Sequence, residues 1–226
     1  MNNPIMYADP SGHFVITATM IWAAIGIGAA IGAGIGFGAA YIPDVIENVK
    51  ADGFQWSDLN TFEGNWQHYI GATLGGAVAG AGIGLCSVLG AGLGVALASK
   101  TSLIVGAKIV GGVAVGGAQV SGLTALGIGV GSAFATGGLG YVVRTGFSDQ
   151  EEFEWSDMFI EAGANAISGM LTFTGAMVGG FMGVKVPGAE FLFKNFALYH
   201  LGAAYFGVYP IKIILAYIKK KLKERY

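Results

Sequence analysis

Five long stretches of the chain lack Asp, Glu, Lys and Arg, and polar segments that carry these residues separate them. The stretches are 14–41, 69–99, 109–143, 162–184 and 195–211. A transmembrane helix needs about 20 mostly apolar residues to cross roughly 30 Å of hydrocarbon. The first four stretches are long enough. The sequence therefore predicts an all-α membrane protein with about four transmembrane helices.

Two of the stretches differ from a simple span. Stretch 109–143 has 35 residues, more than one span needs. It predicts either one helix with a broken end or a re-entrant hairpin. Stretch 195–211 has only 17 residues and contains Pro210. We expect it to form a short fifth apolar element that lies in the membrane interface and does not cross.

Glycine distinguishes these stretches from the core of a soluble protein. The chain has 40 glycines among 226 residues, and six lie between residues 14 and 41. A glycine inside a helix in water costs about 1 kcal/mol relative to alanine. In a bilayer an unpaired backbone group costs more, so the helix forms despite glycine. This favours a membrane protein over a soluble protein with a buried apolar core.

Composition argues against several other classes. With 54% apolar and 12% charged residues the chain is not disordered. Cys86 is the lone cysteine, which excludes a disulfide framework. The 5 prolines and the irregular glycine spacing exclude collagen. A net charge of −2 argues against nucleic acid as a partner.

Two runs of glycine recur at four-residue intervals, which places each run on one helix face. The runs are Gly28, Gly32 and Gly36, and Gly76, Gly80 and Gly84. Small residues at this spacing let two helix backbones approach closely in a bilayer. The runs predict packing within one bundle, or between copies that form a pore. The same spacing recurs in three weaker pairs: Gly71/Gly75, Gly90/Gly94 and Gly112/Gly116.

A short motif occurs twice, 99 residues apart. Residues 54–58 read Phe-Gln-Trp-Ser-Asp and residues 153–157 read Phe-Glu-Trp-Ser-Asp. Ser or Asp before an apolar run is typical of a helix start. Tryptophan is typical of the membrane–water interface. We therefore expect two helix starts with Trp56 and Trp155 as interface anchors, and a duplicated binding site is the alternative.

The basic residues predict how the chain crosses the membrane. Ten of the 12 lie in segments 100–108, 185–194 and 212–226, whereas the two acidic loops hold only Lys50 and Arg144. Lys and Arg favour the cytoplasmic side. We therefore expect residues 1–13, segment 100–108 and the tail on that side, with both acidic loops outside. The basic amphipathic tail, 212–226, should bind anionic lipid. The lipid-binding residues would be Lys219, Lys220, Lys221, Lys223 and Arg225.

The sequence offers little catalytic chemistry. His13, His68 and His200 are far apart and share no ligand spacing. Cys86 lies inside an apolar run, where a small packed side chain is expected. The glycine-rich patterns lack the lysine and the strand–loop–helix context of a phosphate loop. We therefore expect no enzymatic activity, no metal and no cofactor.

The beginning of the chain resembles a known family. Residues 3–13 read Asn-Pro-Ile-Met-Tyr-Ala-Asp-Pro-Ser-Gly-His. This resembles the closing motif, roughly N-P-x-x-Y-x-D-P-x-G, of the RHS/YD-repeat core of bacterial polymorphic toxins. In that family the core is a β-cage, and a variable C-terminal effector region follows the motif. Asp9 matches an aspartate that cleaves the chain in some members, but His13 stands where those members often have Leu.

The resemblance implies that residues 14–226 are such a C-terminal region. We expect a glycine-rich membrane-inserting part, 14–211, followed by the tail, 212–226. The predicted function is a pore-forming effector or a translocation module of a secreted RHS-type toxin, acting by helix insertion and glycine-face association. Its expected partners are the lipid bilayer, further copies of the chain and an immunity protein. The alternative is a non-toxic membrane anchor or a hydrophobic structural module of an RHS protein.

Overall fold

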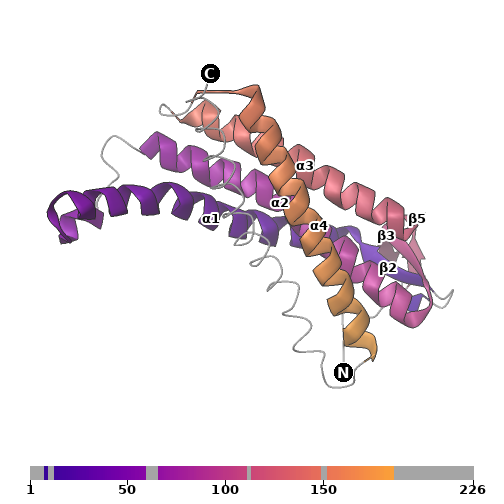
Figure 1. The fold of residues 1–226 in the computed structure, drawn as a ribbon. Helices are drawn as coiled ribbons and strands as arrows, with labels where there is room; N and C mark the ends of the chain where they lie inside the picture. The colour runs from indigo at the N-terminus through magenta and orange to yellow at the C-terminus, as the bar shows by residue number, and fades with distance from the viewer. Residues whose placement is uncertain (1–7, 10–12, 60–65, 111–112, 149–151, 186–226) are drawn as a thin grey trace, which may run out of the picture.

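The structure is a computed structural model that describes residues 8–9, 13–59, 66–110, 113–148 and 152–185 (Figure 1). Four long helices dominate these residues. They are α1 (Ala18–Asp52), α2 (Trp66–Ser99), α3 (Gly122–Phe147) and α4 (Trp155–Lys185). Each is long and apolar enough to cross a membrane. The predicted all-α class with four candidate spans is confirmed.

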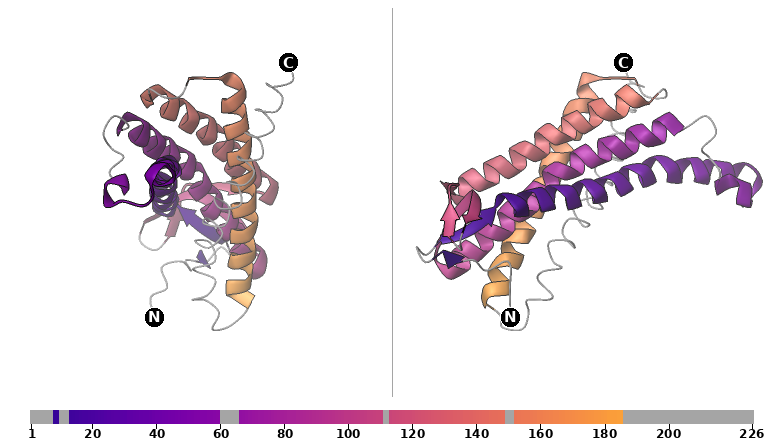
Figure 2. Two further views of the ribbon diagram at one scale, coloured as in Figure 1. Left: turned by 60° about the vertical axis from the view of Figure 1, so that its left-hand side comes forward. Right: turned by 180° about the vertical axis from the view of Figure 1, so that it is seen from behind.

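Helix α2 is the centre of the bundle. It packs against α1, α3 and α4, and α3 also packs against α4. Figures 1 and 2 show α4 crossing the other helices obliquely. The connections α1–α2 and α3–α4 lie at one end of the bundle, which we call the loop end. The opposite end carries a small β-sheet, and we call it the sheet end (Figure 2).

The sheet is an element that the sequence analysis did not predict. Its strands are β1 (Ala8–Asp9), β2 (His13–Thr17), β3 (Ser102–Val110), β4 (Val113–Val115) and β5 (Ala118–Val120). Strand β2 runs parallel to β3, while β1 is antiparallel to β2. Strands β4 and β5 both pair with β3 in antiparallel fashion. The sheet therefore joins residues near the start of the chain to the α2–α3 connection.

The sheet corrects the expected third span. Residues 109–110 and 113–121 lie in strands and their connections, so the third helix begins at Gly122 and not at residue 109. Gly116 and Gly117 have φ angles of +73° and +88°, which turn the chain between β4 and β5. Gly116 therefore lies in a turn and not on a helix face, and Gly112 lies outside the described residues. Ile16 and Leu103 are fully or almost fully buried and lie against Gly92 of α2, so packing on the bundle favours strands here.

Side chains cap two of the helices where the sheet meets the bundle. The Thr17 hydroxyl accepts a hydrogen bond from the Met20 backbone N–H at 3.3 Å, which caps α1. The Ser121 hydroxyl accepts one from the Thr124 N–H at 3.1 Å, which caps α3. These bonds satisfy backbone donors that the first helical turn leaves unpaired. The sequence analysis had placed the start of the first span at residue 14, four residues early.

The repeated motif takes two different conformations. Trp155 begins α4, as expected for a helix start. The first copy instead forms a short 3-10 helix, η1 (Trp56–Leu59), and α2 begins later, at Trp66. The Asp58 carboxylate accepts a hydrogen bond from the Gln55 N–H at 2.7 Å and so closes this turn on itself. The expectation of a helix start at both copies is therefore wrong for the first.

The outer surface of the bundle is apolar. Trp22 of α1, Leu123 of α3 and Phe159 of α4 are 71%, 80% and 57% exposed. Other large apolar side chains are exposed along all four helices. Soluble monomers rarely expose contiguous apolar surface on this scale. The outside of the bundle is therefore suited to contact with lipid.

Candidate functional site

The two glycine runs lie against each other in the same chain. Gly28 faces the backbone of Gly80 and Gly84, and Gly32 faces Gly76 and Gly80. Gly36 meets the Ala72 carbonyl oxygen, and Gly76 in turn meets Gly32 and Gly36. A Cβ atom at Gly28, Gly32, Gly36 or Gly76 would overlap backbone of the opposite helix. The close α1–α2 approach therefore depends on glycine.

Other glycines give α2 two further faces. Gly71 and Gly75 face α3, where a Cβ at Gly75 would lie 2.5 Å from the Gly140 carbonyl oxygen. Gly90 and Gly94 face α4, against the carbonyls of Phe173 and Met177. The backbone of α2 is thus approached closely from three sides. This explains why the central helix is the richest in regularly spaced glycines.

Several other helical glycines have open space around them. A Cβ added at Gly26, Gly34, Gly127 or Gly131 would meet nothing within 4 Å. Gly26 and Gly34 are on α1, whose opposite face carries the run that packs on α2. Glycine is therefore required at some positions of one helix and not at its neighbours. While the bundle is intact, the two predicted runs are not available for contact with another copy.

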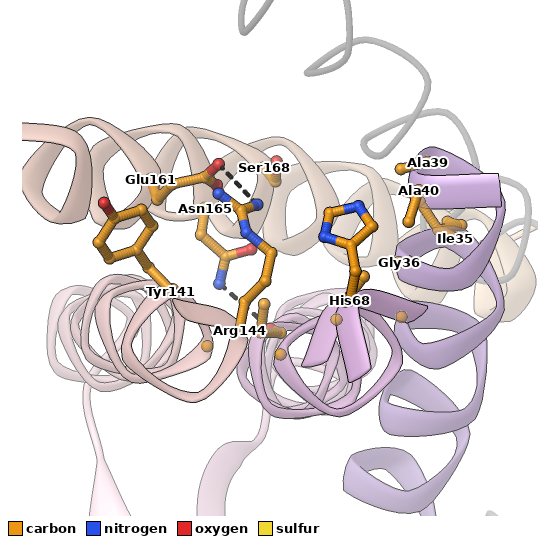
Figure 3. A pocket seen from close by; sticks show the side chains of 17 residues that line it. Ile35, Gly36, Ala39, Ala40, His68, Tyr141, Arg144, Glu161, Asn165 and Ser168 are labelled. Carbon is orange, nitrogen blue, oxygen red and sulfur yellow. Dashed lines mark hydrogen bonds and ion pairs between the residues drawn. The ribbon is translucent and has the colours of Figure 1, made fainter. Parts of the chain in front are cut away.

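A polar pocket lies inside the bundle near the loop end (Figure 3). Its volume is about 170 Å³. Small residues of α1 and α2, such as Gly36 and Ala72, form one wall. Polar side chains of α2, α3 and α4 form the rest: His68, Tyr141, Arg144, Glu161, Asn165 and Ser168. These residues come from three separate helices, and only the packing of the bundle brings them together.

An ion pair lies at this pocket. The Arg144 guanidinium is 3.3 Å from a Glu161 carboxylate oxygen, and their side chains are 29% and 18% exposed. The guanidinium also lies over the Tyr141 ring, 5.4 Å from its centroid. Arg144 is in the last turn of α3 and Glu161 is in the second turn of α4. The pair joins these two helices and leaves the two formal charges balanced.

Asn165 joins three helices deeper in the bundle. Its amide nitrogen donates to the carbonyl oxygens of Ala133 in α3 at 2.6 Å and Ala79 in α2 at 3.1 Å. The residue is only 6% exposed. Ser168, on the same face of α4, donates to the Ala164 carbonyl oxygen at 3.0 Å. Thr172 continues this face, and its hydroxyl is buried without a hydrogen-bond partner.

A second polar contact fixes the loop end of α1. The Tyr69 hydroxyl donates to an Asp44 carboxylate oxygen at 2.5 Å. Phe37 and Tyr41 pack on Tyr69, with ring centroids 6.0 Å from it in both cases. His68 lies 3.1 Å from the Ser148 hydroxyl, through Nδ1. These contacts hold α1 and the α3–α4 connection against the start of α2.

The structure places the predicted anchors at the loop end. Trp56 and Trp155 are 81% and 66% exposed, and each packs edge-on against the phenylalanine two residues before it. Their role as anchors at a membrane interface stays a prediction. Asp9 pairs with His13 between β1 and β2. Stretch 195–211 and the tail lie outside the described residues, so their predicted lipid contacts stay predictions.

Within the described ranges, no group of three or more His, Cys, Asp or Glu side chains could hold a metal. Cys86 is fully buried, with its sulfur beside Gly129 and Gly169. The sequence analysis named Arg144 only as a basic residue of an acidic loop and did not select Asn165. A signal for both was present, because Arg144 directly follows an uncharged stretch and Asn165 lies inside one.

Comparisons with models of known families, with curated proteins and with solved structures found no match.

Proposed function

We propose that this chain is an integral membrane module that spans a bilayer with α1, α2, α3 and α4. The observation that carries the proposal is the apolar outer surface of the bundle, together with helices long enough to cross. In lipid, exposed Trp22, Leu123 and Phe159 replace contact with water by contact with acyl chains. The same surface in water would promote aggregation.

The positions of the polar groups support this arrangement. The described acidic residues of both connections, among them Asp58 and Glu154, lie at the loop end, and Lys100 and Lys108 lie at the sheet end (Figure 2). Four successive crossings would put the loop end on one side of the bilayer and the sheet end on the other, which is the arrangement that the basic residues predict. Close glycine seams support stable helix association in lipid, where helices gain no hydrophobic energy by meeting one another.

We further propose that the module is the membrane-inserting effector or translocation region of an RHS-type toxin. The resemblance of residues 3–13 supports this assignment. Insertion of the bundle into a target membrane would weaken its ion barrier, and an immunity protein would protect the producing cell. Because the two glycine runs pack inside the chain, the inserting unit is the folded bundle of one chain.

The experiment is inducible expression of the full chain in bacteria, with the membrane potential followed by a dye. We expect the expressing cells to lose membrane potential and the chain to be found in their membrane fraction. A Gly32→Leu, Gly80→Leu variant should depolarise much less, because it separates α1 from α2. Gly26→Leu, Gly34→Leu is the matched control, since both positions have open space. A chain that enters the membrane without depolarising it contradicts the effector proposal.

That last result would support the alternative, a non-toxic membrane anchor of an RHS protein. One observation favours this alternative. The two glycine runs, which are the most regular packing surfaces in the sequence, are used within the chain. Assembly of several copies into a pore would need other surfaces. An anchor needs only the four spans and the apolar exterior.

A further inference from the structure

The polar pocket occupies a gap in the bundle. Helices α1 and α4 each pack on α2, yet they make little contact with one another. The pocket fills the space between them, with Ala39 of α1 on one side and Ser168 of α4 on the other (Figure 3). Residues of all four helices therefore line the pocket.

The pocket reaches well into the spanning segments. Ala79 and Ser168, which both line it, lie 79 − 66 = 13 and 168 − 155 = 13 residues after the starts of α2 and α4. At a rise of 1.5 Å per residue this is about 20 Å along each helix. The hydrocarbon core is only about 30 Å thick. Polar atoms therefore line a space deep within the predicted membrane region.

Such a space can hold a polar occupant in a bilayer. The Asn165 amide nitrogen and the Ser168 hydroxyl already donate to backbone carbonyl oxygens of the bundle, whereas the Arg144 guanidinium and the Glu161 carboxylate are charged groups that lipid tails cannot solvate. The pocket volume of about 170 Å³ has room for several water molecules. The Arg144–Glu161 pair balances the two formal charges. In Figure 3 the amide oxygen of Asn165 turns toward the middle of the pocket. The walls therefore suit water and small hydrophilic molecules.

We propose that the pocket is an aqueous vestibule, which water and small hydrophilic molecules enter from the loop end and which reaches Ala39. The mouth is marked by His68 in the first turn of α2, Arg144 in the last turn of α3 and Glu161 in the second turn of α4. The floor is the small-residue surface of α2. The vestibule rests on the membrane-spanning arrangement proposed above, but it does not depend on toxicity.

The test is cysteine accessibility in the full chain, reconstituted in liposomes on a Cys86→Ala background. The probe is 2-aminoethyl methanethiosulfonate, a small hydrophilic thiol reagent, and the modified fraction is followed by intact mass. Ala39→Cys is the main variant, because Ala39 lines the pocket and is partly exposed. Leu171→Cys on α4 is the control, because it is at a similar depth and faces outward with 50% exposure.

We expect Ala39→Cys to react at least ten times faster than Leu171→Cys. If both react equally slowly, the vestibule is overturned while the spans stand. Ser156→Cys, at the exposed loop end, is labelled in parallel as the fully accessible reference. If Leu171→Cys reacts as fast as Ser156→Cys, the outer face of α4 is not in lipid, and the membrane-spanning arrangement fails with it.

Discussion

Replacing Gly32 by alanine should destabilise the bundle, whereas the same change at Gly34 should not. The two residues are two positions apart on α1. A Cβ at Gly32 would overlap the carbonyl oxygen of Gly76 and lie 2.9 Å from the Gly80 Cα. A Cβ at Gly34 would have nothing within 4 Å. The pair therefore separates interhelical contact from the general effect of adding a methyl group.

The magnitude follows from what must move. The atoms opposite Gly32 are backbone, so no side-chain rotation relieves the overlap, and α1 has to move away from α2. Overpacking of this kind costs about 1–3 kcal/mol. Gly34→Ala gains helix propensity, by at most about 1 kcal/mol in water. We expect the free energies of unfolding of the two variants to differ by about 1–3 kcal/mol, with Gly34→Ala the more stable.

The assay is reversible unfolding in detergent micelles, titrated with sodium dodecyl sulfate and followed by circular dichroism. Wild type, Gly32→Ala and Gly34→Ala are compared under identical conditions. Equal midpoints for the two variants would refute the close α1–α2 seam. A Gly34→Ala midpoint below that of Gly32→Ala would refute the assignment of which face of α1 is packed.

Two further predictions concern the polar groups of the pocket. Asn165→Ala removes hydrogen bonds to Ala133 and Ala79. It should lower the free energy of unfolding by about 1–2 kcal/mol, since hydrogen bonds between membrane helices contribute about 0.6 kcal/mol each and at most about 1.7. The same titration measures this loss, and an unchanged midpoint would contradict the interhelical role. Arg144→Gln and Glu161→Gln should each destabilise the bundle by leaving a charge unpaired, and the double variant should be more stable than either single variant. If the two losses in the free energy of unfolding simply add in the double variant, the two side chains are not coupled.

The uncharged stretches predicted the number of candidate spans because a helix that crosses lipid lacks charged residues along its length. They did not predict where the helices end. Helix α1 continues past Tyr41 and through Pro43 to Asp52, because charged residues limit a span without stopping a helix. Helix α4 begins at Trp155, seven residues before the uncharged stretch, for the same reason.

The sheet could not be predicted from local pattern. Apolar stretch 109–143 contains valines and glycines that suit either a strand or a buried helix. The decisive contact is the pairing of Phe14 with Leu103, residues far apart in the sequence. Both side chains are buried in the cluster that also includes Leu89 of α2. Only the folded bundle brings these three segments together.

The glycine runs show the same division between local and distant information. Their spacing predicted that each forms a packing face, but it left open what each face meets. The structure pairs them in antiparallel order, with Gly28 near Gly84 and Gly36 near Gly76. The pocket was missed because its polar residues are scattered over three helices. None of them forms a motif along the chain.

The most direct test of the four-span arrangement is sided cysteine labelling of the full chain in intact cells, on a Cys86→Ala background. Single cysteines replace Ser57, Ser156 and Lys108, and the probe is a membrane-impermeant maleimide. Ser57 and Ser156 lie at the loop end and Lys108 lies in β3 at the sheet end. We expect the first two to label from the same side, and Lys108→Cys to label only from the opposite side. Labelling of all three from one side would contradict the four-span bundle.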